Sequence, residues 1–281
     1  MKNTTKIQIL GNQIPLRAGT SFGVNATDPE MIHEELYNIT MRLKRSAIFI
    51  DEHEMLCDTM TALEYLMFAT KHLEKTKTVF RQKEFLEQLI SVGLGYISLT
   101  PIRLLTPQEK MLLLLWCGLC SNKEYIIFNV TGYEFDDELI LCMKKIIRRF
   151  KKENTTLITG TMQPKLIGIC LEETLFIHEK KILYYGLVSA LKHCMDRVLY
   201  VIKHANEIEL VTRLEKAFPM YEIRSGNQLI FVMRKKTTIR DDEMFFETLA
   251  KEKIVPDMIQ INHGRIENSF QELIEYHDIL K

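Results

Sequence analysis

The fold is decided by four segments between residues 104 and 186, which are LLTPQEKMLLLL (104–115), EYIIFNVTGYEFDD (124–137), TTLITGTM (155–162) and LFIHEKKILYYG (175–186). The first has the capping pattern of a helix start, and the next two contain short apolar strands. The last predicts a closing strand. A basic amphipathic helix (137–150) separates the second segment from the third. Near-continuous apolar strands that alternate with helices are typical of an α/β domain with a parallel sheet covered on both faces.

The rest of the chain extends this pattern on both sides. Residues 5–50 alternate short strands with a helix that begins near Thr27, and residues 58–104 have the apolar spacing of helices. After Gly186 the segments follow the order β-α-β-β-α-β, which predicts a small α+β domain of the ferredoxin-like type. We therefore expect two domains, residues 1–187 and residues 188–281.

The composition excludes several classes of protein. Hydrophobic residues make up 46% of 281, so disorder is not expected. The 37 basic residues balance the 37 acidic ones, which gives no overall attraction to nucleic acid or to anionic membranes. No apolar run reaches the length of a membrane span, and no signal peptide is visible. Free cysteines without an export signal indicate the cytosol, and the only CxxC pair, Cys117 and Cys120, has no second pair for zinc.

The basic run KKIIRRFKK (144–152) has two interpretations. It could contact nucleic acid, but Ile146, Ile147 and Phe150 interleave with helical spacing. Basic residues also suit the end of a helix, where the dipole is negative. We favour a solvated helix face and expect no nucleic-acid partner.

The order and spacing of the segments over residues 20–187 resemble the ATP-binding cassette (ABC) ATPases. The ending GRIENSFQELI (264–274) is similar to the "SLEDVFLELT" ending of bacterial drug- and peptide-export cassettes, which carry a small αβ domain after the cassette. The resemblance implies a P-loop NTPase-like cassette with a helical subdomain at about residues 58–104. It also identifies the positions at which the family binds phosphate, Mg²⁺ and water.

The phosphate loop aligns with GVNATDPE (23–30). Gly23 and Asn25 match the start of the family loop, but Pro29 replaces its Lys and Glu30 replaces its Ser/Thr. Thr27 and Glu30 have the spacing of a capping box, and Asp28 before Pro29 also suits a helix N-cap. We expect carboxylates at the helix end where a phosphate would otherwise bind.

Two further family positions lie in the helical region and at its end. Glu52 stands in place of the Q-loop Gln, within an acidic cluster (51–54) that we interpret as a solvated loop rather than a metal site. The signature motif LSGGQ aligns with LTPQE, where Pro107 removes an N–H donor. Thr106 and Glu109 are expected to form a capping box. The five aligned residues are Leu105, Thr106, Pro107, Gln108 and Glu109.

The remaining positions concern Mg²⁺, the attacking water and the γ-phosphate. The strand that should end in Asp and Glu ends instead in Asn129 and Val130, which offer no charge for the metal and no general base. Asp136 occupies the D-loop position but is also a plausible N-cap, which we favour. Met162 replaces the switch His of the H-loop, and none of the eight histidines is expected near this strand end.

These replacements predict a pseudo-ATPase with no catalytic residue, no metal site and no cofactor, and they argue against ATP binding. The resemblance implies a subunit of an ABC transporter for peptide or drug export or for immunity. Such a subunit would be cytoplasmic, peripheral to the inner face of the membrane, and paired with a membrane-spanning subunit, a second cassette, or both, as a homo- or heterodimer. Two alternatives stay open: a free-standing protein-interaction module, and a composite-site ATPase that is active only in a heterodimer.

Overall fold

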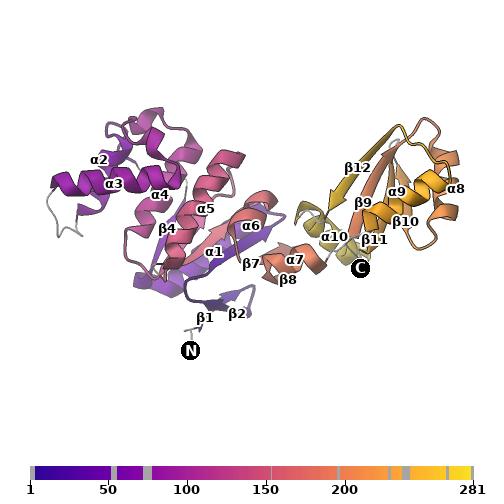
Figure 1. Cartoon of the computed structure of the whole chain (residues 1–281). Coiled ribbons are helices and arrows are strands. Elements are labelled where there is room, and N and C mark those ends of the chain that lie inside the picture. Colours follow the sequence, from indigo (N-terminus) through magenta and orange to yellow (C-terminus); the bar gives the residue numbers. More distant parts are fainter. Residues whose placement is uncertain are drawn as a thin grey trace. The chain divides into compact units, whose positions relative to one another are not determined.

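The computed structural model describes residues 4–51, 56–71, 78–152, 154–194, 197–226, 229–235, 241–263 and 266–279. The chain divides into two compact units (Figure 1). Unit 1 comprises Met1–Val188 together with Leu273–Lys281, and unit 2 comprises Ser189–Glu272. The end of the last helix therefore belongs to unit 1, whereas the sequence pattern assigns all of residues 188–281 to the second domain.

Unit 1 is built on a six-stranded sheet with the order β4-β5-β6-β3-β7-β8. Its strands are β3 (Ser21–Ala26), β4 (Ala47–Ile50), β5 (Tyr125–Asn129), β6 (Thr156–Gly160), β7 (Glu173–His178) and β8 (Lys181–Leu187). All neighbouring pairs are parallel except β7 and β8. The structure thus has the mixed α/β character and the largely parallel sheet that the sequence predicts.

The single closing strand expected over residues 175–186 is instead an antiparallel hairpin of β7 and β8. Glu179 and Lys180 form its turn with φ of 47° and 61°. Two successive residues with positive φ give a turn whose twist matches that of the strands. Neither turn position is Asn or Gly, the residues usual at such positions, so the sequence pattern does not predict this turn.

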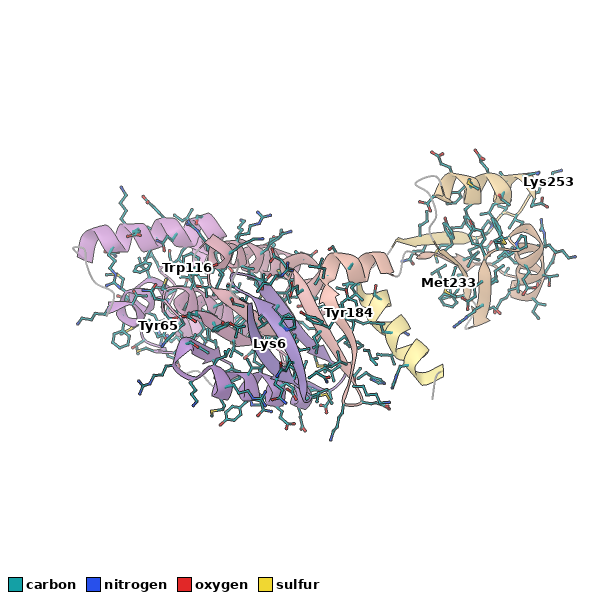
Figure 2. All side chains as sticks on the ribbon, turned by 90° about the horizontal axis from the view of Figure 1, so that it is seen from below. Lys6, Tyr65, Trp116, Tyr184, Met233 and Lys253 are labelled. Carbon is teal, nitrogen blue, oxygen red and sulfur yellow. The ribbon has the colours of Figure 1, made fainter. Side chains whose placement is uncertain are left out.

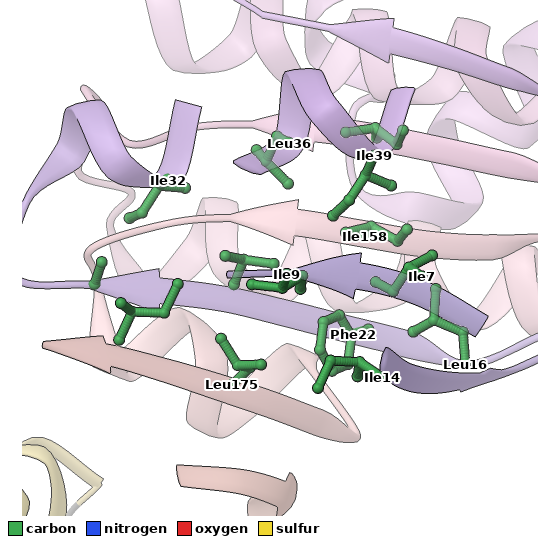
Figure 3. Close-up of a cluster of buried hydrophobic side chains, with 14 residues drawn as sticks. Ile7, Ile9, Ile14, Leu16, Phe22, Ile32, Leu36, Ile39, Ile158 and Leu175 are labelled. Atoms are coloured by element: carbon green, nitrogen blue, oxygen red, sulfur yellow. The ribbon is translucent and has the colours of Figure 1, made fainter. Parts of the chain in front are cut away.

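Helices cover both faces of the sheet. α1 (Pro29–Leu43) packs on one face together with the hairpin of β1 (Thr4–Ile9) and β2 (Asn12–Arg17). Figure 3 shows Ile32, Leu36 and Ile39 of α1 directed toward the strands of the sheet, which include β6 with Ile158. The other face is covered by α4 (Pro107–Leu119), α5 (Asp137–Lys152) and α6 (Pro164–Cys170). Burial on both faces explains the apolar runs of β5 and β6.

The region predicted to be helical contains α2 (Ala62–Ala69) and α3 (Thr78–Val92), with short 3₁₀ turns at Gly95–Ile97 and Ile102–Leu104. A third turn, Lys44–Ser46, follows α1. Thr61 begins α2 with a complete capping box to Glu64. α7 (Val188–Cys194) follows β8, and all of it except Val188 belongs to unit 2. Among the described residues, no helix combines the length and apolar content that a bilayer crossing requires.

Unit 2 has the predicted order of elements. They are β9 (Arg197–Lys203), α8 (Glu207–Ala217), β10 (Glu222–Gly226), β11 (Leu229–Lys235), α9 (Asp241–Lys251) and β12 (Met258–His263), followed by α10 (Ile266–Ile279). The sheet order is β10-β11-β9-β12, and all pairs are antiparallel. Tyr200 of β9 stacks on Phe245 of α9 with ring centroids 3.6 Å apart, inside a separate apolar core.

Candidate functional site

The parallel strands of unit 1 bring their carboxyl ends to one edge of the sheet. We call this the carboxyl edge and define it by the connections after β3 (27–28), β5 (130–136) and β6 (161–163). Open parallel sheets bind ligands at such an edge, because helices begin there and the loops converge. Five of the positions aligned with the family lie in these connections: Thr27, Asp28, Val130, Asp136 and Met162. The start of α4 adjoins them, because Gln108 donates to the carbonyl of Glu134.

The connection between β3 and α1 is too short to be a phosphate loop. Gly23 and Asn25 lie inside β3, and only Thr27 and Asp28 separate the strand from the helix. Gly23 is needed for packing, since a Cβ there would lie 2.7 Å from Cδ1 of Leu171. Asn25 donates from Nδ2 to the carbonyl of Thr161, at 2.8 Å. The aligned eight-residue stretch is therefore strand up to Ala26 and helix from Pro29, and it does not form a long loop.

The start of α1 is capped by its own chain. Asp28 is the N-cap, its Oδ1 accepts from the backbone N–H of Glu30 at 3.0 Å, and Pro29 is the first helical residue. Of the two capping patterns in the sequence, this is the one formed. Thr27 takes no part in a box with Glu30, because its hydroxyl lies 3.1 Å from Nδ1 of His178 at the end of β7.

The end of β5 is occupied by a neutral hydrogen-bonded group. Asn129 is buried, its Nδ2 lies 3.2 Å from Nδ1 of His33, and its Oδ1 accepts from the hydroxyl of Thr131 at 3.0 Å. The neighbouring Val130 is fully buried. This arrangement places two neutral side chains where the family has a Mg²⁺-binding carboxylate and a general base.

The expectation that no histidine stands at the end of β6 is not contradicted, but two histidines lie at other strand ends of the sheet. His33 of α1 and His178 of β7 both lie at strand ends of the carboxyl edge, although neither follows β6. His33 also packs edge-on against Phe49 with ring centroids 5.9 Å apart. No local sequence pattern predicts these contacts, because each joins residues that are far apart along the chain.

The signature position is a helix start. Thr106 caps α4 with the predicted capping box to Glu109, and Pro107 is the first helical residue. Leu105 is buried, and Gln108 donates to the carbonyl of Glu134 at 3.1 Å. Burial, together with a hydrogen bond to Glu109, raises the pKa of Tyr96 above its ordinary value.

The connections that contain the D-loop and H-loop positions are joined by hydrogen bonds. Oδ1 of Asp136 accepts from the N–H of Leu139 at 2.8 Å, so Asp136 caps α5. Met162 is 39% exposed and points no polar group at the edge. Gln163, which the sequence did not single out, exchanges hydrogen bonds of 2.7 and 3.1 Å with the backbone of Phe135.

The charge of the carboxyl edge is negative. Its three connections contain Asp28, Glu134 and Asp136 and no Lys or Arg. The Q-loop position, Glu52, lies outside the described residues, as do His53 and Glu54 of the acidic cluster. Among the residues that are described, no group of three or more His, Cys, Asp and Glu side chains is arranged to hold a metal ion.

Comparisons with known proteins agree with the fold alone. No protein-family model matches the sequence, and no curated protein matches it. Among solved structures, the chain is similar to a chain from the inward-facing structure of a transporter described as a metal-chelate type ABC transporter. The match covers 81% of this chain and 90% of that one, with 12% identity and a TM-score of 0.50. The chain therefore has a fold related to ABC transporter proteins.

Proposed function

We propose that this chain is a catalytically inactive nucleotide-binding-domain-like subunit of an ABC transporter, with a structural or regulatory role. The resemblance of its C-terminal segment favours the peptide- or drug-export and immunity systems. In this proposal the chain acts on the cytoplasmic side of a membrane, beside a membrane-spanning subunit, a second cassette, or both. Unit 2 is proposed to be a ferredoxin-like domain, which its strand order supports.

One observation carries the proposal of inactivity, namely the two-residue connection between β3 and α1. A triphosphate is held by several backbone N–H groups of a long loop and by a Lys at the helix start. Here Asp28 occupies the helix end, and the helix begins with Pro29, which has no N–H. The carboxylate would repel a phosphate at the positive end of the helix dipole, where the phosphate would otherwise be stabilised.

The negative charge of the carboxyl edge supports the same conclusion. Phosphoryl transfer requires cations around the transferring group and a residue that orients water. The three connections supply carboxylates only, and Asn129 with Val130 supplies neither a charge for Mg²⁺ nor a base. A second cassette with intact motifs would not restore hydrolysis, because the signature position of this chain is a capped helix start with Pro107.

The helical region supports a role in binding a partner. Five large apolar side chains are more than half exposed there: Phe68 of α2, Ile90 of α3, and Tyr96, Leu99 and Leu104 in the turns before α4. The resemblance implies that the helical subdomain contacts the membrane subunit. Exposed apolar side chains are suited to protein contacts.

Calorimetric titration with Mg-ATP tests the proposed inactivity. The natural chain is compared with Asp28→Ser, because Ser caps a helix about as well as Asp but carries no charge. We expect no binding by either protein up to millimolar nucleotide, since the loop is missing in both. Micromolar binding by the natural chain would refute the proposal. Binding by the variant alone would show that charge, and not the short connection, is the barrier.

Site-specific photo-crosslinking in the native host tests the proposed partner. A photoreactive residue at Leu104 is compared with one at Ile208, which is 83% exposed but lies in unit 2. We expect Leu104 to crosslink to an integral membrane protein and Ile208 not to do so. Crosslinks from Leu104 to soluble proteins only would contradict the transporter role and favour the free-standing interaction module.

A further inference from the structure

The opposite edge of the unit 1 sheet, where β5 and β6 begin, is positively charged. The C-terminal half of α5 presents five cations there, which we call the basic face: Lys144, Lys145, Arg148, Arg149 and Lys151. Between them, Ile146, Ile147 and Phe150 are buried. Because the whole chain has no net charge, five cations on one helix face concentrate positive potential at this edge.

Most of the basic face is not neutralised by the protein. Lys151 forms an ion pair with Glu172. Lys145, Arg148 and Arg149 make no hydrogen bond or ion pair with any residue in the described part of the chain. Favourable placement at the negative end of the helix dipole explains why cations are tolerated here. It does not explain the cavities beside them.

Arg149 lies between two cavities. The larger, of about 400 Å³, is bounded by the end of α4, the turn before β5 and the start of β6, and Arg149, Lys123 and Trp116 line it. The smaller, of about 260 Å³, adjoins the end of α3 and is lined by Lys145, Arg148 and Arg149. A cavity of the larger size is within the range that small ligands occupy.

The larger cavity combines apolar surface with donors. Trp116 is 2% exposed, and Leu119 beside it is half-buried. The indole Nε1–H of Trp116 is buried and has no acceptor among the residues that the structure describes. A buried donor without an acceptor is uncommon in folded proteins. Arg149, Lys123 and the amides of Asn122 and Asn154 add further donors, and Glu124 is the one carboxylate among the described residues of the lining.

We propose that this cavity binds an organic phosphate, with the phosphate on Arg149 and Lys123 and the organic part against Trp116 and Leu119. The guanidinium group matches phosphate oxygens in a bidentate geometry. Lys123 donates one N–H to the carbonyl of Arg45 at 2.8 Å, which positions its ammonium group and leaves two further donors. The ligand is a free phosphate ester or the headgroup of a phospholipid, which share this chemistry.

Nucleic acid is the less suitable ligand for the same surface. Single-stranded nucleic acid requires exposed aromatic side chains on which bases stack. The only aromatic residue of the C-terminal half of α5, Phe150, is 1% exposed, and Trp116 is buried. The basic face therefore offers charge without a stacking platform, whereas the adjoining cavity has the size to accommodate a small molecule.

Titration with phenyl phosphate tests the proposal on the full chain. Trp116 is the only tryptophan and lines the cavity, so its fluorescence reports binding directly, with heat as a second signal. Inorganic phosphate serves as the probe without an organic part, at matched ionic strength. Vesicles of phosphatidylglycerol and phosphatidylcholine, compared with phosphatidylcholine alone, test the lipid source.

The deciding comparison is between Arg149→Gln and Arg148→Gln. Both remove one charge from adjacent residues of α5, but Arg148 does not line the larger cavity. We expect Arg149→Gln to weaken phenyl phosphate or vesicle binding about 10- to 100-fold, the worth of a charged hydrogen bond. Arg148→Gln should change the affinity less than about threefold, because it alters only the surrounding potential.

The outcomes separate a built site from a diffuse charge. Saturable binding that depends on Arg149 supports the proposal, and the probe that binds identifies the source of the phosphate. Equal weakening by the two variants, or binding that added salt abolishes in proportion to charge, would overturn it. Absence of binding to phenyl phosphate and to anionic vesicles would overturn it as well. Urea unfolding of each variant verifies that the fold is retained.

Discussion

Replacing Gly160 with Ala should destabilise unit 1, because α1 lies directly on the end of β6. A Cβ at Gly160 would lie 2.6 Å from Cγ2 of Ile32 and closer still to Cδ1 of Leu36. Carbon atoms attract at roughly 3.5–4.0 Å, so the helix would have to move outward by about 1 Å. Ile32 and Leu36 are fully buried, which leaves them no space into which they could turn.

The magnitude follows from two opposing effects. Overpacking of a filled core costs about 1–3 kcal/mol, while the smaller entropy of an unfolded chain with Ala returns about 0.5 kcal/mol. We therefore expect Gly160→Ala to lower the free energy of unfolding by about 1–2 kcal/mol. Trp116 is the only tryptophan, is buried in α4 and belongs to unit 1 (Figure 2), so urea unfolding followed by its fluorescence reports this unit.

Leu36→Ala in both backgrounds provides the decisive control. Alone it should cost about 2–5 kcal/mol, because it empties a closed site. In the Gly160→Ala background it should cost at least about 1 kcal/mol less, because the new methyl group fills part of that space. Gly118→Ala is the matched glycine replacement, since its Cβ would meet the flexible end of Ile50 at 2.8 Å and Cγ2 of Ile126 at 3.3 Å, and neither Ile32 nor Leu36. Equal costs of Leu36→Ala in the two backgrounds would refute the close approach.

Three further predictions follow from single side chains. Burial raises the pKa of the Glu35 carboxyl above its ordinary value of 4.5. The free energy of unfolding should therefore fall as the pH rises from 4.5 through the pKa of the folded state. Glu35→Gln should remove this fall in urea titrations between about pH 4 and pH 7. Thr106→Ala should cost about 1 kcal/mol through loss of the α4 cap, whereas Thr106→Ser should cost less than half of that, in the same unfolding assay. Cys57 is exposed, whereas burial raises the pKa values of Cys142 and Cys170, the latter to about 12. Peptide mapping after brief alkylation should therefore find Cys57 modified first. Faster labelling of Cys170 would contradict its burial.

The features that could be predicted from the sequence are those that local chemistry determines. Apolar periodicity predicted β5, β6 and α5, because burial of one or both faces of an element determines the spacing of its apolar residues. The box of Thr106 and Glu109 was predictable because both partners lie within one helical turn. The order of elements in unit 2 followed from the same two signals.

The features that were missed depend on contacts between distant residues. His33 meets Asn129 only when α1 packs across the end of β5, and Gln163 meets Phe135 only when two connections converge. The alignment with the family's phosphate-loop motif also placed Gly23 and Asn25 in a loop, whereas both lie in β3. Whether a strand continues to Ala26 is decided by pairing with β6 and β7, which an alignment of motifs does not contain.

Three helices begin at the carboxyl edge with a side-chain cap supplied by their own chain: Asp28 for α1, Thr106 for α4 and Asp136 for α5. The first N–H groups of a helix need acceptors, and in a nucleotide-binding cassette phosphate oxygens supply some of them. At these three helix starts an oxygen of the chain's own side chains accepts from one of the first N–H groups, whereas α6 begins after Gln163 without a side-chain cap. The same oxygens make the edge negative, which opposes a triphosphate. Capping therefore supports the proposal that this edge does not bind nucleotide, because the chain's own side chains hold three of the helix starts and add negative charge.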